Sequence, residues 1–144
     1  MQAVMRTSIQ QRVMAGNARQ RIQSNVMHWA HHIYRTSDCS WSEALQRGWE
    51  MHYMKEMLAH GVVEFTFMKK DCTERLARGT NNMEIIPPSK EPTGRQQAAI
   101  EADLAEPNYK SIAYFDLDKE AWRAFSVERF VQVNRLMAMT AVEC

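Results

Sequence analysis

Positively charged residues gather on one short stretch of this sequence, and the chemistry that they suggest most directly is phosphate binding. Four of them lie close together in the sequence, and a fifth stands beside a tryptophan nearer the C-terminus. They are Lys69, Lys70, Arg75, Arg78 and Arg123, with Trp122 as the aromatic neighbour. Small β-barrels bind single strands with cations that follow the phosphates and aromatic rings that stack on bases. The alternative is a core aromatic beside a solvated strand edge whose charges discourage edge pairing.

The N-terminal segment is a second basic region. Residues 1–37 contain five arginines and neither a lysine nor an acidic residue. The rest of the chain holds 13 of the 18 lysines and arginines against all 17 acidic residues, and the formal net charge is +1. Arg12, Arg19 and Arg21 are therefore further candidates for binding nucleic acid or a partner. The alternative is that the arginines only keep a helix soluble.

Other reactive side chains do not predict an enzyme. Asp116 and Asp118 fall at an expected turn, where aspartate usually bonds the local backbone. His28, His31 and His32 have a helical spacing that can hold a metal ion, but few further ligands lie near them in the sequence. The chain has no glycine-rich phosphate loop, nucleophile elbow or zinc-ligand series. We expect a non-enzymatic protein without a metal or another cofactor.

The cysteines and the hydropathy indicate a cytoplasmic protein. Cys39, Cys72 and Cys144 are odd in number and far apart, so they predict no disulfide framework. Cys72 is expected on an exposed turn beside two lysines, but no candidate base lies near it for catalysis. No apolar run approaches the roughly 20 residues that a membrane span needs. We expect the host cytoplasm, or a virion, if a phage encodes the protein.

Two helices are predicted before any strand. Residues 3–35 carry apolar residues at helical spacing, with a shift at Gly16 where the helix is expected to kink or split. Such a long amphipathic helix needs a partner for its apolar stripe. Ser40 opens a capping box with Glu43, and the second helix is expected to reach about His60. Gly48 would allow another backbone to approach, and Gly61 predicts a left-handed helix end.

Alternating apolar and polar residues predict five short strands after the helices. The strands are expected at residues 62–68, 74–79, 110–116, 122–126 and 130–133, with a 3₁₀ turn at 127–129 before the last. This pattern is typical of a small SH3-like barrel. Residues 87–108 hold all four prolines and predict a long surface loop, in which residues 95–105 can form a short helix.

The fold class is therefore α+β: two N-terminal helices followed by a small five-stranded SH3-like antiparallel barrel, with a long loop inserted between strands 2 and 3. We divide the chain into three parts. They are a basic amphipathic helical arm at 1–38, a helix-plus-barrel domain at 39–134, and a C-terminal tail at 135–144.

Three phrases of the sequence resemble one family. They are SWSEAL at 40–45, GVVEFTFMKKDCTER at 61–75 and FDLDKEAWRAF at 115–125. They are similar to the WYL-like, Sm-type SH3 β-barrel family of small proteins from gut bacteria and their phages. The resemblance covers about residues 40–133 and implies a helix followed by an SH3-like barrel. Related WYL domains are regulatory modules linked to ligands or nucleic acid, but their Trp-Tyr-Leu signature is absent here.

Two departures from the family pattern stand out. Cys72 occupies the turn position where the family usually has glycine, so a positive φ there would be strained. The 1–35 helix and the 87–108 insertion lie outside the shared phrases, and any function particular to this chain is expected there.

The functional prediction is an interaction module that binds protein or nucleic acid, with a phage as a candidate source. One alternative is a structural component of a larger particle such as a virion, because the Met-rich and Trp-rich helices offer more apolar surface than one barrel covers. The helices would then bind a protein partner or a second copy of the chain. Another alternative is a regulatory domain that senses a small ligand. No membrane partner is expected.

Overall fold

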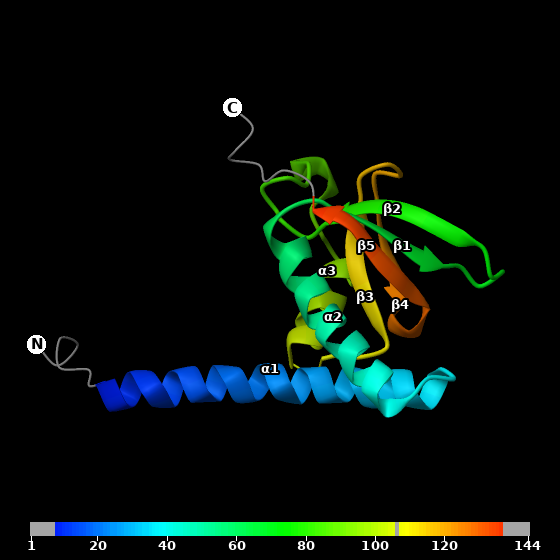
Figure 1. Ribbon diagram of the computed structural model, residues 1–144. Coiled ribbons are helices and arrows are strands. Elements are labelled where there is room, and N and C mark those ends of the chain that lie inside the picture. Colours follow the sequence, from blue (N-terminus) through cyan, green and yellow to red (C-terminus); the bar gives the residue numbers. More distant parts are fainter. Residues whose placement is uncertain (1–7, 106, 137–144) are drawn as a thin grey trace, which may run out of the picture.

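The computed structural model describes residues 8–105 and 107–136. Figure 1 shows α1 lying across one end of the molecule, with its N-terminal half extending beyond the curved sheet. The elements are α1 Ser8–Thr36, α2 Trp41–His60, β1 Val63–Met68, β2 Glu74–Thr80, η2 Pro88–Lys90, α3 Arg95–Ala105, β3 Ser111–Asp116, β4 Ala121–Ser126, η3 Val127–Arg129 and β5 Phe130–Leu136. The α+β class, the five strands and the 3₁₀ turn before the last strand are confirmed.

The helix α1 runs through Gly16 without the expected break. Residues 3–7, where the helix was predicted to begin, lie outside the described residues. The C-terminal half of α1 supplies the apolar stripe, because Val26, Trp29, Ala30 and Ile33 are all buried. This half of α1 is therefore part of the core of the fold.

The helix α2 begins as the sequence predicts. Ser40 is its N-cap, and the Ser40 hydroxyl oxygen accepts a hydrogen bond from the Glu43 N–H at 3.1 Å. The buried side of α2 consists of Ala44, Gly48, Met51, Met54 and Leu58. Gly48 faces α1, where a Cβ atom would lie 2.6 Å from the Val26 carbonyl oxygen. The predicted close approach at Gly48 is therefore confirmed.

The end of α2 differs from the prediction. Gly61 follows the last turn and donates its N–H to the Met57 carbonyl oxygen at 3.0 Å. Its φ is −164°, however, which is extended backbone and not the left-handed conformation that we expected. The chain passes directly into β1 two residues later, so an extended residue fits there better than a left-handed turn.

The five strands form one antiparallel sheet in the order β4-β3-β2-β1-β5. Its shortest pairing is between β2 and β3, where only Gly79 with Asp116 and Thr80 with Phe115 are opposed. The far end of the β1–β2 hairpin therefore extends away from β3 (Figure 1). Among the described strands, β4 and β5 do not pair, so the predicted barrel is an open one.

The turn of the β1–β2 hairpin carries the strain that the resemblance implied. Cys72 has a φ of +68°. Few residues other than glycine adopt this conformation without a cost, so Cys72 holds a strained backbone conformation at the turn. The Asp71 side chain stabilises the turn by accepting bonds from the Thr73 N–H at 3.0 Å and the Thr73 hydroxyl at 2.5 Å.

Candidate nucleic-acid interface

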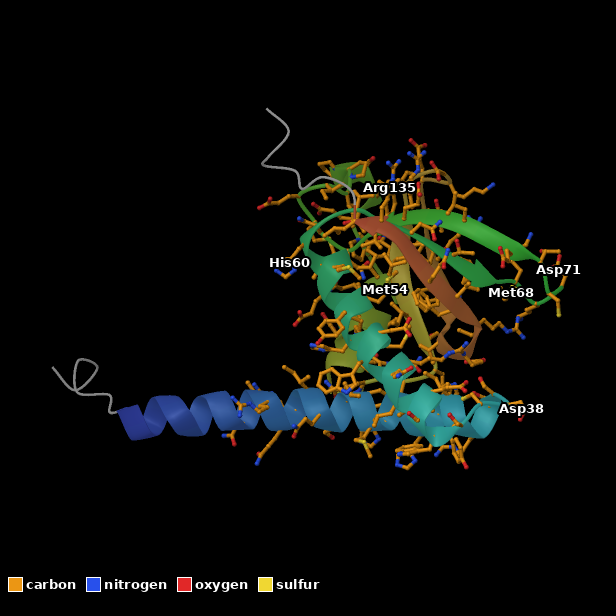
Figure 2. All side chains as sticks on the ribbon, viewed as in Figure 1. Asp38, Met54, His60, Met68, Asp71 and Arg135 are labelled. Atoms are coloured by element: carbon orange, nitrogen blue, oxygen red, sulfur yellow. The ribbon has the colours of Figure 1, made fainter. Side chains whose placement is uncertain are left out.

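A cleft of about 350 Å³ separates the far end of the β1–β2 hairpin from β4 and η3. It exists because β2 leaves β3 after two residue pairs, so that the hairpin and β4 form opposite walls. The residues lining it are Phe67, Met68, Lys69, Lys70, Arg75, Tyr114, Arg123, Ala124, Phe125, Ser126 and Arg129. Figure 2 labels Met68 and Asp71 at this end of the hairpin, on the opposite side from the extended part of α1.

The lining of the cleft is positively charged and contains no carboxylate. Lys69, Lys70, Arg123 and Arg129 form no ion pair with any described residue. The nearest acid along the hairpin is Asp71 in the turn, whose pKa is lowered chiefly by the hydrogen bond from the Thr73 hydroxyl. Asp71 is held by Thr73 and does not line the cleft, so four cations remain available there for an anionic ligand.

Arg75 also lines the cleft, but its charge is already neutralised. Arg75 Nη2 donates to Asp116 Oδ2 at 2.5 Å, and the Asp116 side chain is fully buried. Asp116 Oδ1 accepts the N–H groups of Asp118 at 2.9 Å and Lys119 at 3.1 Å, which fixes the β3–β4 turn. The turn role predicted for Asp116 is therefore present, and Asp116 also holds Arg75 against the interior of the sheet.

Arg78 points away from the cleft because successive side chains of a strand face opposite sides of the sheet, and Arg78 lies an odd number of residues after Arg75 on β2. Its guanidinium donates to both carboxylate oxygens of Asp118, at 2.5 and 3.3 Å. This pairing raises the pKa of Arg78 and lowers that of Asp118, in both cases chiefly through the shared hydrogen bond. Both side chains are almost half exposed, so the pair is a surface contact.

Trp122 lies on the outer face of the sheet, apart from the cleft. Its indole N–H donates to the Lys90 carbonyl oxygen at 2.9 Å, and its ring meets the Phe115 ring edge-on at 5.6 Å between centroids. The aromatic residues that do line the cleft are Phe67, Tyr114 and Phe125, all buried members of the core. The cleft therefore offers cations over a buried aromatic floor.

Two arginines predicted on the N-terminal helix are distant from the cleft. Arg19 and Arg21 are exposed in the N-terminal half of α1, which extends to the side opposite the hairpin turn (Figure 1). The side chain of Arg12 lies outside the described part of the chain. The structure thus brings together Lys69, Lys70, Arg75 and Arg123 from the predicted set, and it separates them from Arg19 and Arg21.

Sequence reasoning missed Arg129 and Tyr114 as cleft residues. Arg129 ends the 3₁₀ turn η3, and only the path of the chain between β4 and β5 places it beside β4. Tyr114 lies on the same face of β3 as Ile112, and that position is typical of a core residue, not of a residue that lines a cleft. The alternation along β3 and β4 was the signal that could have placed Tyr114 on the same face as Arg123, its partner on β4.

The histidines have separate structural partners. His28 stacks on Tyr109 with 4.7 Å between ring centroids, and His31 packs against Trp41 at 4.8 Å. His32 Nε2 lies 3.1 Å from Glu128 Oε2, which ties α1 to η3. Within the described residues, no three histidine, cysteine or acidic side chains gather closely enough to hold a metal ion.

Tyr114 gives a prediction that tests the floor of the cleft. Its side chain is fully buried, and its hydroxyl has no hydrogen-bond partner among the described residues. We expect Tyr114→Phe to leave the free energy of unfolding at pH 7 unchanged or to raise it by up to about 1 kcal/mol, because the variant removes a buried hydroxyl that lacks a partner. Denaturant unfolding of both proteins measures this change.

The same residue predicts a change at alkaline pH. Burial raises the pKa of Tyr114 to about 12, from a value near 10 in the unfolded chain. The folded state thus holds the phenolic proton more tightly than the unfolded chain does. The contribution of this proton to the free energy of unfolding is therefore complete below pH 10 and is lost as the pH rises to 12. Tyr114→Phe should remove that part of the decline, whereas the exposed Tyr53→Phe should not. A larger decline in Tyr114→Phe would contradict the assignment.

The fold and the comparisons with known proteins agree on the family. The chain belongs to the WYL_2 family, described as having an Sm-like SH3 beta-barrel fold, whose model matches residues 51–131. The resemblance seen in the sequence is therefore confirmed. The matched region begins within α2, includes β1 to β4 and α3, and ends at the start of β5, whereas α1 precedes it.

A phage protein is among the relatives of this chain. It is the uncharacterized 11.5 kDa protein in the Gp31–cd intergenic region of Enterobacteria phage T4. The two are 30% identical over 81 residues, which cover 56% of this chain and 74% of the relative. No solved structure gives a significant match. Neither the family description nor the name of the relative includes an enzymatic activity.

Proposed function

We propose that the protein is a non-enzymatic module that binds single-stranded nucleic acid in the cleft between the β1–β2 hairpin and β4. One observation carries the proposal: four cations that form no ion pair with a described residue, Lys69, Lys70, Arg123 and Arg129, surround one cleft whose described lining has no carboxylate. A phosphate backbone supplies the complementary charge, and its affinity comes from the release of condensed counterions.

The shape of the cleft favours a single strand over a duplex. A single strand is narrow and flexible enough to enter a concave site, whereas a duplex is a wide rigid rod. The lining includes no asparagine, glutamine or acidic residue that would read base edges. We therefore expect binding to be governed by phosphates and to depend little on sequence.

The test is fluorescence anisotropy with labelled oligonucleotides of about 12 nucleotides, as single-stranded RNA, single-stranded DNA and duplex DNA. Lys70→Glu/Arg123→Glu should weaken single-strand binding at least about tenfold, and should reduce the slope of log K against log salt by about 1.4. The matched control Lys90→Glu/Arg95→Glu changes the same residue types by the same charge at exposed positions outside the cleft, and should retain nearly full affinity.

Three results would contradict the proposal. They are binding that does not change with salt, equal losses in the two double variants, and no binding by the wild-type protein at low salt. A preference for the duplex would contradict the single-strand part alone.

The basic half of α1 is a second candidate contact surface. If the strand also reaches α1, Arg19→Gln/Arg21→Gln should reduce the slope of log K against log salt. If it does not, the slope should equal that of the wild-type protein. Self-association or a protein partner through α1 stays a prediction. A truncation that tests it should stop at about residue 20, since Val26, Trp29 and Ile33 belong to the core.

The phage relative supports a role in an infected bacterium. We accordingly propose the host cytoplasm as the place of action, with a virion component as the alternative. None of the described helices has the length and the apolar character of a membrane span.

A further inference from the structure

A second cavity, of about 700 Å³, lies under α3 on the outer side of the β3–β4 hairpin. Most of its lining surface is apolar, although six of the 13 lining residues are polar or charged. The residues are Lys55, Asn81, Met83, Gln96, Ala99, Ile100, Ala102, Asp103, Asn108, Ser111, Ile112, Ala113 and Trp122. Cavities of this size, with apolar walls and few polar groups, are typical of small-molecule sites.

The cavity remains open because α3 does not pack directly on the sheet. Among the described side chains of α3, Ile100 is the bulkiest apolar one in the cavity lining, and it is only half-buried. An ion pair between Lys55 Nζ and Asp103 Oδ2, at 3.6 Å, joins α3 to the helical layer. Protein interiors are close-packed, so a gap of this size between a helix and a sheet leaves apolar surface that a ligand would cover.

Asn81 fixes one wall of the cavity. Its side-chain amide nitrogen donates to the Ala113 carbonyl oxygen at 2.9 Å. Its Oδ1 atom is closed to solvent and so does not face the cavity. Asn81 therefore shapes the wall without offering that oxygen to a ligand.

The remaining walls restrict the chemistry of the ligand. Lys55 and Asp103 neutralise each other, so the cavity favours an uncharged molecule. The Trp122 ring is fixed by its hydrogen bond to the Lys90 carbonyl oxygen and presents a rigid aromatic wall. Flat aromatic molecules pack well against such a ring.

From these observations we propose that the cavity binds a small, uncharged, planar aromatic molecule that packs against Trp122, with α3 as its cover. This site is separate from the nucleic-acid cleft, which lies on the opposite face of the same hairpin. The inference therefore does not depend on the proposed function.

Indole is a suitable probe, because it is a flat, uncharged aromatic ring system. Titrated into the full-length ¹⁵N-labelled protein, indole should bind with a Kd of about 0.1–1 mM. It should shift the resonances of the Asn81 side-chain amide and the Trp122 indole N–H. Hydrogen exchange of the α3 backbone amides should slow when indole is bound, because the ligand fills the gap beneath the helix.

Absence of any shift with indole at about ten times the expected Kd would overturn the site itself.

A pair of matched variants locates the site. Ala99→Trp places a large side chain in the cavity and should abolish indole binding, whereas Ala98→Trp makes the same change beside it, outside the lining, and should not. The rest of the amide spectrum reports whether each variant keeps its fold. Indole binding that survives Ala99→Trp in a folded protein would overturn the proposal.

Discussion

Gly48→Ala should destabilise the protein by about 2 kcal/mol, although alanine is the better helix former. In an isolated helix this change would stabilise by about 1 kcal/mol. Here the new Cβ atom would lie 2.6 Å from the Val26 carbonyl oxygen and 3.3 Å from the Ala30 backbone nitrogen. A backbone oxygen cannot rotate aside as a side chain can, so α1 and α2 must separate. Overpacking of this kind typically costs about 1–3 kcal/mol, and more where the obstacle is rigid.

Denaturant unfolding measures this change. Gly48→Val should cost still more, because its branched side chain adds two methyl groups at the same crossing. Gln46→Ala provides the control, since Gln46 is exposed on α2 and reports the helical preference alone. A Gly48→Ala protein as stable as the wild type would show that the two helices do not approach as closely as described.

Asp116→Ala should cost about 3–5 kcal/mol, the largest loss that we expect from a single polar residue. The change leaves the mostly buried Arg75 guanidinium without its carboxylate. It also leaves the N–H groups of Asp118 and Lys119 without their acceptor. Removing one partner of a buried ion pair is costly because the other charge stays out of water.

A matched aspartate two residues away serves as the control. Asp118 contacts Arg78 at the same 2.5 Å, but both side chains of that pair are almost half exposed. Asp118→Ala should therefore have a much smaller effect, because exposed ion pairs contribute little. Similar losses from the two alanine variants would mean that burial does not distinguish the pairs.

Asp116→Asn separates stability from binding. Asparagine keeps an oxygen that can accept the two turn N–H groups but has no charge to neutralise Arg75. We expect a smaller loss of stability, of about 1–3 kcal/mol. We also expect single-strand affinity to rise about threefold, since one more cation of the cleft becomes available. Unchanged affinity in a folded Asp116→Asn protein would show that Arg75 does not face the bound strand.

Local chemistry in the sequence was sufficient for much of the fold. The Ser40 cap and the alternating strands each depend on residues near one another in the chain, and a glycine within a helix was enough to predict the close approach at Gly48. The left-handed helix end predicted at Gly61 was wrong. Glycine often ends a helix in that conformation, but here the chain continues straight into β1. The open sheet was unpredictable, since it depends on how soon β2 leaves β3.

The candidate site was harder to predict because it depends on tertiary pairing. Arg75 and Arg78 looked equivalent in the sequence, but carboxylates about 40 residues later hold one in the interior and the other on the surface. Arg129 reaches the cleft only through the turn between β4 and β5. Charge alone thus indicated the kind of ligand, while the described contacts decided which cations are available for it.

Consecutive residues of one hairpin face two different surfaces. Ala113 and Trp122 line the cavity under α3, whereas their neighbours Tyr114 and Arg123 line the cleft. A change in the twist of β3 and β4 would move the lining residues of the cavity and of the cleft together. If occupation of one side alters that twist, thermodynamic linkage requires the other side to respond by the same factor in return. Under that condition the β3–β4 hairpin, a single layer of sheet, would couple the cavity under α3 to the cleft allosterically.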